Sequence, residues 1–149
     1  MIRALLATAL VAAAAPGPAV AQAPPTARQL IDARVAGMHM AATLFYRGVK
    51  GALANGADVR QIFHEPEGLA LWANAIPGLF PAGSGGEGSR ARPEIWTRRA
   101  DFERKAADLG VAATRVAERA RAGDRAGFAA AADAVEAACT ACHSAYRSE

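Results

Sequence analysis

Apolar residues recur at alternating steps of four and three along most of the sequence after residue 26, and this spacing limits the fold more than any other feature. Side chains at that spacing lie on one face of an α-helix, and the face must pack against another apolar surface. Alanine, the residue that best tolerates a helix, is very abundant, and 149 residues suit one compact domain. The sequence therefore predicts an all-α protein.

The first two helices are predicted from their start signals. The first begins at a capping box of Thr26 and Gln29 and ends at Asn55-Gly56. The second begins near Asp58, and Pro66 is expected to kink or split it. The expected apolar stripe of the first helix is Ile31, Val35, Met38, Ala42, Phe45 and Val49.

The last two helices follow a glycine-rich segment, Pro77 to Pro93, which is long enough for a crossover along a bundle. The third helix is predicted from Thr97 to Ala122, and the fourth follows a break at Gly123-Asp124. Four such helices predict a four-helix bundle. Because the last two stripes are rich in alanine, the core would be thin, and a bulky non-protein group could fill the missing volume. These stripes are Phe102, Ala106, Leu109, Ala113, Val116 and Ala120, then Phe128, Ala132, Val135, Cys139, Cys142 and Tyr146.

Residues 1–21 have the pattern of a secretory signal peptide, with Arg3, an apolar stretch over 4–15 and small residues up to Ala21. Cleavage is expected after Ala21, or alternatively after Ala23, which leaves 24–149 as a single exported, periplasmic domain. The apolar stretch is too short to span a membrane, and no later segment is long enough. The formal net charge of +3, without a basic run, gives no support for nucleic acid as a partner.

Cys139-Thr140-Ala141-Cys142-His143 is the attachment sequence of a c-type haem, in which two sulfurs bond the haem vinyl groups and the imidazole binds iron. On a helix, positions i, i+3 and i+4 lie on one face, so the three side chains can reach one cofactor. The alternatives are a redox-active or disulfide-bonded cysteine pair, or half of a zinc site completed by His39 or His64. Neither alternative accounts together for the adjoining histidine, the export signal and the thin core.

The sequence resembles the class II c-type cytochromes, which comprise cytochrome c′ and the related low-spin cytochromes c-556. The resemblance rests on the attachment motif near the C-terminus and the ending from Cys142 to Arg147, on Arg92-Pro93-Glu94-Ile95-Trp96 with Ala100-Asp101-Phe102 following, and on Arg34 four residues before Met38. It implies an antiparallel four-helix bundle with one haem c covalently bound to the last helix and facing the first. It also implies that His143 is the proximal iron ligand.

The resemblance implies further haem contacts, each with an alternative. Arg147 matches a basic residue beside the proximal histidine; the alternative is an arginine that only interacts with the dipole at a helix C-terminus. Arg34 matches an arginine near the haem propionates; the alternative is a solvated arginine on a helix face. Met38 either ligates iron, as in the low-spin members, or packs over an open iron, as in cytochrome c′. The neighbouring His39 and Met40 should point away from this face, and His64 should be exposed.

The expected function is that of an exported single-electron carrier between periplasmic redox proteins. No catalytic triad, phosphate-binding loop or carboxylate pair suggests an enzyme. The second hypothesis is a five-coordinate haem protein that binds nitric oxide or carbon monoxide. The third is a haem-free bundle with a disulfide between Cys139 and Cys142, which would be colourless. A homodimer through the first two helices is a further expectation from the resemblance.

Overall fold

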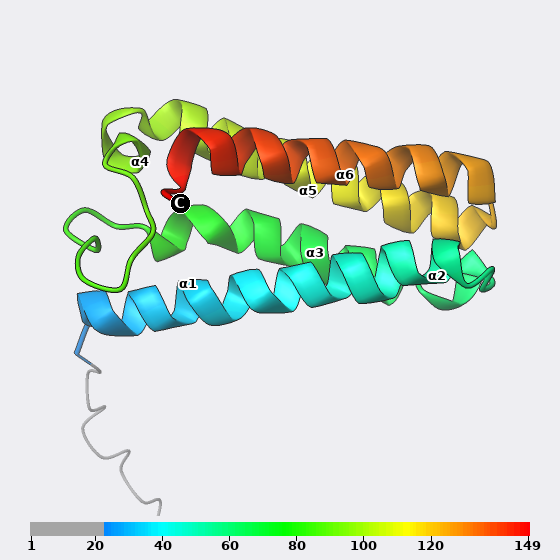
Figure 1. Cartoon of the computed structure of the whole chain (residues 1–149), viewed down its shortest axis with the longest axis horizontal. Coiled ribbons are helices and arrows are strands. Elements are labelled where there is room, and N and C mark those ends of the chain that lie inside the picture. Colours follow the sequence, from blue (N-terminus) through cyan, green and yellow to red (C-terminus); the bar gives the residue numbers. More distant parts are fainter. Residues whose placement is uncertain (1–22) are drawn as a thin grey trace, which may run out of the picture.

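The computed structural model describes residues 23–149, so the predicted signal peptide lies outside the described residues. Four long helical segments run alternately in opposite directions and form an elongated bundle (Figure 1). Over residues 23–149 there is no strand, and the only β-type pairing is an isolated bridge between Ala91 and Arg147. The predicted all-α, antiparallel four-helix bundle is confirmed.

The first segment is one rod made of α1 (Ala27–Ala42), the π-helix η1 (Thr43–Lys50) and α2 (Gly51–Ala54). The capping box at its start is present, with both the Thr26 and Gln29 side chains bonded to backbone N–H groups. Asn55 ends the rod, as the sequence predicts.

The buried face of this rod differs from the predicted stripe. Val35 is 46% exposed and Ala42 is also exposed. A π-helix bonds residue i to residue i+5, so its wider turn keeps residues four apart on one face. The interior therefore receives Ala41, Phe45 and Val49 at steps of four, and nearer the start of the rod it receives Ile31, Arg34 and Gly37.

The second segment consists of a 3-10 turn η2 (Val59–Gln61), the helix α3 (His64–Ala75) and a 3-10 turn η3 (Ile76–Leu79). The predicted split is present, but it falls at residues 62–63. Pro66 lies in the first turn of α3, where its missing N–H leaves no intrahelical hydrogen bond unmade.

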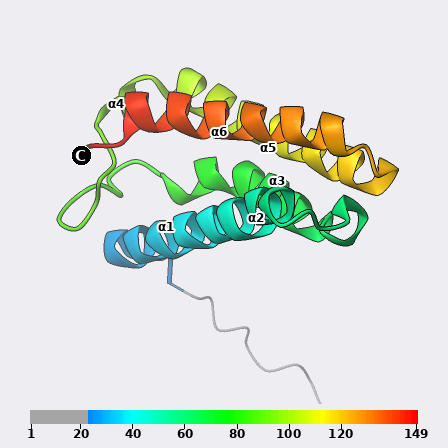
Figure 2. The ribbon, with the colours of Figure 1, turned by 45° about the vertical axis from the view of Figure 1, so that its right-hand side comes forward.

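Residues 80–93 form a loop at one end of the bundle, followed by the single-turn helix α4 (Glu94–Thr97) and by α5 (Arg99–Ala122). The loop joins neighbouring ends of α3 and α5, so the predicted crossover along the bundle is wrong (Figures 1 and 2). Two side chains hold the loop at its base. The Arg99 guanidinium donates to the carbonyl oxygens of Pro77 (2.7 Å) and Phe80 (2.8 Å), and Trp96 Nε1 donates to that of Pro81 (2.8 Å).

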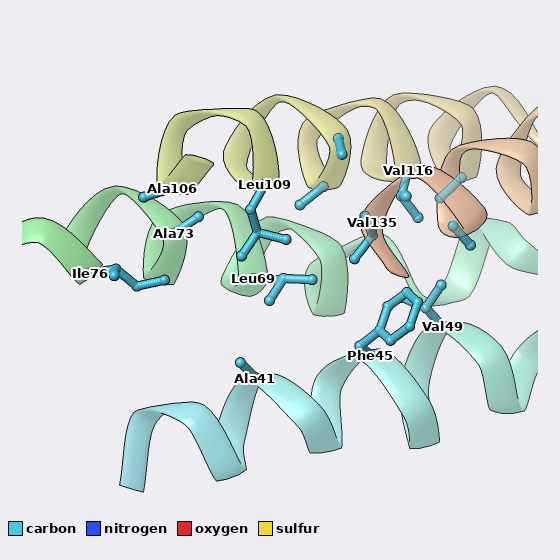
Figure 3. Close-up of a cluster of buried hydrophobic side chains, with 14 of the residues drawn as sticks. Ala41, Phe45, Val49, Leu69, Ala73, Ile76, Ala106, Leu109, Val116 and Val135 are labelled. Carbon is cyan, nitrogen blue, oxygen red and sulfur yellow. The ribbon is translucent and has the colours of Figure 1, made fainter. Parts of the chain in front are cut away.

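The turn between α5 and α6 (Arg125–Tyr146) has the predicted composition. Gly123 ends α5 with φ of +68°, a left-handed conformation that glycine adopts without strain, and the Asp124 side chain accepts from the N–H of Gly127. The apolar stripe of α5 is buried throughout, and that of α6 is buried except for the two half-buried cysteines. Figure 3 shows this core, with Leu69, Leu109, Val116 and Val135 facing the side chains of the first rod.

Candidate haem site

α6 is helical without interruption through residues 139–143, so the attachment motif keeps the i, i+3, i+4 spacing predicted for it. Cys139, Cys142 and His143 are half-buried, and both cysteines pack against the central core. Both thiols are free. The helix therefore presents two thiols and one imidazole together, partly shielded from water.

Burial sets the protonation of all three groups. Burial raises the pKa of the Cys139 thiol, and the neighbouring Cys142 raises it further. Burial also raises the pKa of the Cys142 thiol. Burial lowers the pKa of His143, and the positive charges of Arg147 and Arg90 lower it further. The imidazole is therefore neutral at pH 7, which is the form that binds a metal ion.

Arg34 on α1 is buried, which excludes the interpretation of a solvated helix-face arginine. Its guanidinium donates from Nη1 to Ser84 Oγ (3.3 Å) and from Nη2 to the Ser84 carbonyl oxygen, and it lies 4.4 Å from the ring centroid of Phe80. Burial lowers its pKa. Because no described carboxylate pairs with it, this buried cation lacks the anion that would offset its desolvation.

Trp72 on α3 is a residue of this region whose role the sequence analysis missed. Its indole ring lies against the backbone of Gly37, one residue before Met38, and a Cβ at position 37 would overlap the ring. Its Nε1 is buried and has no hydrogen-bond acceptor among residues 23–149. A glycine inside an otherwise regular helix costs stability, so Gly37 was the available signal that a large side chain approaches here.

Met38 is half-buried and packs against the same core as the two cysteines. His39 and Met40 are exposed, as predicted from their place on the helix. His64 is also exposed, with Nδ1 3.2 Å from Oε2 of Glu67. Within residues 23–149 no group of three or more His, Cys, Asp or Glu side chains is placed to hold a metal ion, and this includes the two cysteines with His39 or His64.

Arg147 does not continue α6. The helix ends at Tyr146, and Arg147 has extended backbone geometry while its N–H still donates to the His143 carbonyl oxygen (3.0 Å). This bond from residue 147 to residue 143 is the α-helical one, so Arg147 is the C-cap of α6 and lies one turn after His143. The charge of Arg147 acts on His143.

These observations test whether the residues fit a haem. Two thiols and a neutral imidazole share one helix, while a buried guanidinium lacks an anion and a buried indole N–H lacks an acceptor. A haem matches this set, since it supplies vinyl carbons, an iron and propionate carboxylates. The fold and the site together define a c-type haem protein built on a four-helix bundle.

Comparison with known proteins identifies the family. The chain belongs to the Cytochrome C' family, whose model matches residues 29–147. Proteins of this family carry covalently attached haem c. Among residues 23–149, no helix has the length and apolarity needed to cross a membrane.

Three similar proteins are informative. A segment of 75 residues, half of this chain, is 47% identical to cytochrome c-556 from Agrobacterium tumefaciens and spans 60% of that protein. Cytochrome c' from Thermochromatium tepidum is 30% identical with a TM-score of 0.78, over 85% of this chain and all of that one. A nitric oxide complex of a cytochrome c prime variant from Alcaligenes xylosoxidans is 29% identical with a TM-score of 0.74, over 83% of this chain and 96% of that one.

Proposed function

We propose that this protein is an exported cytochrome that carries single electrons between periplasmic redox proteins. Haem c supplies a one-electron couple between ferric and ferrous iron. Cys139 and Cys142 are the thioether anchors and His143 is the proximal ligand in this proposal. The half-buried, uninterrupted α6 supports these roles, because it holds the three groups in a fixed relation to one another.

The proposed electron-transfer role depends on Met38. It packs against the same core as the two cysteines, and its thioether is a suitable sixth iron ligand. Ligation by methionine and histidine raises the reduction potential, and a six-coordinate site rearranges little on reduction. The identity with a cytochrome c-556 over half of the chain supports the same role.

Arg34 is proposed to bind a haem propionate. Its guanidinium is buried, is held by Ser84 and lacks a carboxylate partner, so a bound propionate would offset its charge. Trp72 is proposed to keep the face beside Met38 apolar and closed to water, because its ring covers Gly37.

The test is the visible absorption spectrum of protein matured in a host that attaches c-type haem, recorded oxidised, reduced, and reduced under carbon monoxide. We expect sharp low-spin bands that do not respond to carbon monoxide. The variant Met38→Ala should convert the iron to high spin, while Met40→Ala, at the exposed neighbour, should leave the spectrum unchanged. An unchanged spectrum of Met38→Ala would exclude methionine ligation.

A second function is favoured by one of the similar structures, which holds nitric oxide on a protein of this fold. In this alternative Met38 packs over the site without ligating iron, and the protein binds nitric oxide or carbon monoxide. Broad high-spin bands that shift under carbon monoxide would support the alternative. A colourless protein after competent maturation would contradict both functions.

Export is proposed from residues 1–21 and can be tested separately. N-terminal sequencing of protein recovered from the periplasm should begin at Gln22, or at Pro24 if cleavage follows Ala23. Protein that retains Met1 and stays in the cytoplasm would contradict export.

A further inference from the structure

Three arginines surround the end of α6, and we call Arg90, Arg92 and Arg147 the arginine face. The bridge between Ala91 and Arg147 places residues 90–92 beside residues 146–148. Two backbone hydrogen bonds hold this pairing, from Arg92 N to the Tyr146 carbonyl oxygen (3.0 Å) and from Ser148 N to that of Arg90 (2.9 Å). The loop before α4 and the end of α6 therefore present their positive charges together.

The charges of the arginine face are not neutralised by described carboxylates. Arg90 Nε donates to the Ser148 carbonyl oxygen (3.1 Å), and Arg92 Nη1 donates to that of Ser144 (3.3 Å). Glu149, the nearest acidic residue in sequence to Arg147, forms no ion pair within residues 23–149. By contrast, other arginines are paired with carboxylates, namely Arg28, Arg60, Arg98, Arg99, Arg104, Arg119 and Arg121.

Capping of α6 explains only part of this arrangement. A helix C-terminus favours a nearby cation, but it carries only about half a negative elementary charge, which is less than the charge of one arginine. Lys105 on α5 adds another cation without an ion pair in the described part of the chain, and its charge acts on Cys142. The surplus positive charge is therefore available to an external anion.

The arginine face also begins where the attachment motif ends. Ser144, whose carbonyl oxygen binds Arg92, directly follows His143, and the charges of Arg90 and Arg147 both act on His143. Electron transfer weakens steeply with distance, so a redox partner gains by docking near the helix that bears the cofactor. Backbone hydrogen bonds hold residues 90–92 beside residues 146–148, so the arginine face is formed before a partner docks.

We propose that the arginine face is the docking surface for a redox partner that presents a cluster of carboxylates; this proposal rests on the proposed electron-carrier function. Guanidinium groups bind carboxylates through two parallel hydrogen bonds, which fixes orientation as well as attraction. Charge complementarity of this kind accelerates encounter more than it strengthens the final complex.

The test compares haem-loaded wild type with two triple variants of equal net charge. The first variant is Arg90→Gln, Arg92→Gln and Arg147→Gln. The matched control removes three exposed arginines on η1, η2 and the second half of α5, as Arg47→Gln, Arg60→Gln and Arg115→Gln. A third variant replaces the three arginines of the arginine face by lysines, which keeps the positive charge. This variant tests the role of charge even if the glutamine variant does not fold.

Binding is measured with a redox-inert probe, a hexaglutamate peptide titrated at low ionic strength and followed by amide chemical shifts. We expect shifts at residues 90–92 and 144–148 in wild type, the control and the lysine variant. The glutamine variant of the arginine face should lose them. Shifts located elsewhere, or lost equally in both glutamine variants, would overturn the proposal.

Electron exchange is measured by stopped flow with hexacyanoferrate(III), an anion, and tris(phenanthroline)cobalt(III), a cation. In the glutamine variant of the arginine face, the ratio of the rate with the anion to the rate with the cation should fall about tenfold at low ionic strength. The ratio is used because loss of Arg147 beside His143 changes the driving force toward both reagents alike. The rates of the control should stay within about twofold of wild type. The difference in this ratio between wild type and the glutamine variant of the arginine face should vanish at about 0.5 M salt. Wild type that reacts with neither reagent contradicts the electron-carrier function, whereas equal slowing of both variants contradicts only the docking surface.

Discussion

Arg34 is a buried cation that contacts Ser84 and the Phe80 ring and pairs with no carboxylate among residues 23–149. A fixed positive charge near a haem favours the reduced state. We expect Arg34→Met to lower the reduction potential by tens of millivolts, since about 59 mV corresponds to a tenfold change in a one-electron equilibrium. Potentiometric titration measures this shift. Arg28→Met, at an exposed position of the same helix, is the control and should leave the potential almost unchanged.

Tyr146 couples the end of α6 to α5 at the residue scale. Its buried hydroxyl donates to Asp101 Oδ2 (2.6 Å), and this hydrogen bond, with the charge of Arg104, lowers the pKa of Asp101. A carboxyl with a lowered folded-state pKa contributes stability above its unfolded pKa and loses it as pH falls. In Tyr146→Phe, we expect a lower Tm at pH 7 and a smaller further loss on acidification to about pH 3. An acid dependence equal to that of wild type would show that the hydrogen bond does not set this pKa.

At the scale of elements, the packing of the first rod against α3 depends on a glycine. Helix propensity alone predicts that Gly37→Ala stabilises the protein by up to about 1 kcal/mol. The structure predicts the opposite sign, a loss of about 1–3 kcal/mol, because the new methyl group would overlap the Trp72 ring. Urea unfolding of the haem-loaded protein measures the difference.

Gly51 provides the matched control on the same rod. A Cβ there would lie 3.7 Å from the Tyr46 carbonyl oxygen, an ordinary contact, so Gly51→Ala should be neutral or stabilising. Combining Gly37→Ala with Trp72→Leu should recover part of the loss, since the overlap disappears. If Gly37→Ala and Gly51→Ala behave alike, Trp72 does not pack as described.

At the scale of the whole molecule, exposed apolar side chains gather on the first two helical segments. Val35, Met40 and Tyr46 lie on the first rod and Leu71 on α3, and Leu71 is 72% exposed. These are the segments through which the resemblance implies a homodimer. We expect sedimentation to show a dimer that Tyr46→Glu and Leu71→Glu shift toward monomer, because each buries a charge in the interface.

Val111, exposed on α5, gives the control for this prediction. Val111→Glu adds the same charge on α5 rather than on the first two segments, and it should leave the oligomeric state unchanged. A monomer in wild type at high concentration, or equal dissociation in all three variants, would contradict the dimer.

The sequence by itself determined the elements that depend on local rules. The capping box at Thr26, the break at Gly123-Asp124 and the stripes of α5 and α6 follow from backbone hydrogen bonding and helical periodicity, which involve residues close in sequence. The attachment motif is equally local, because its three side chains lie within five residues of one helix.

Only the tertiary structure decided which face of the first rod is buried and how the site residues are surrounded. The π-helical stretch changes the register of the stripe, so Val35 and Ala42 are exposed. The burial of Arg34, the contact of Trp72 with Gly37 and the pairing beside Arg147 all join segments tens of residues apart. Such contacts depend on how helices pack against each other, a property that no local pattern contains.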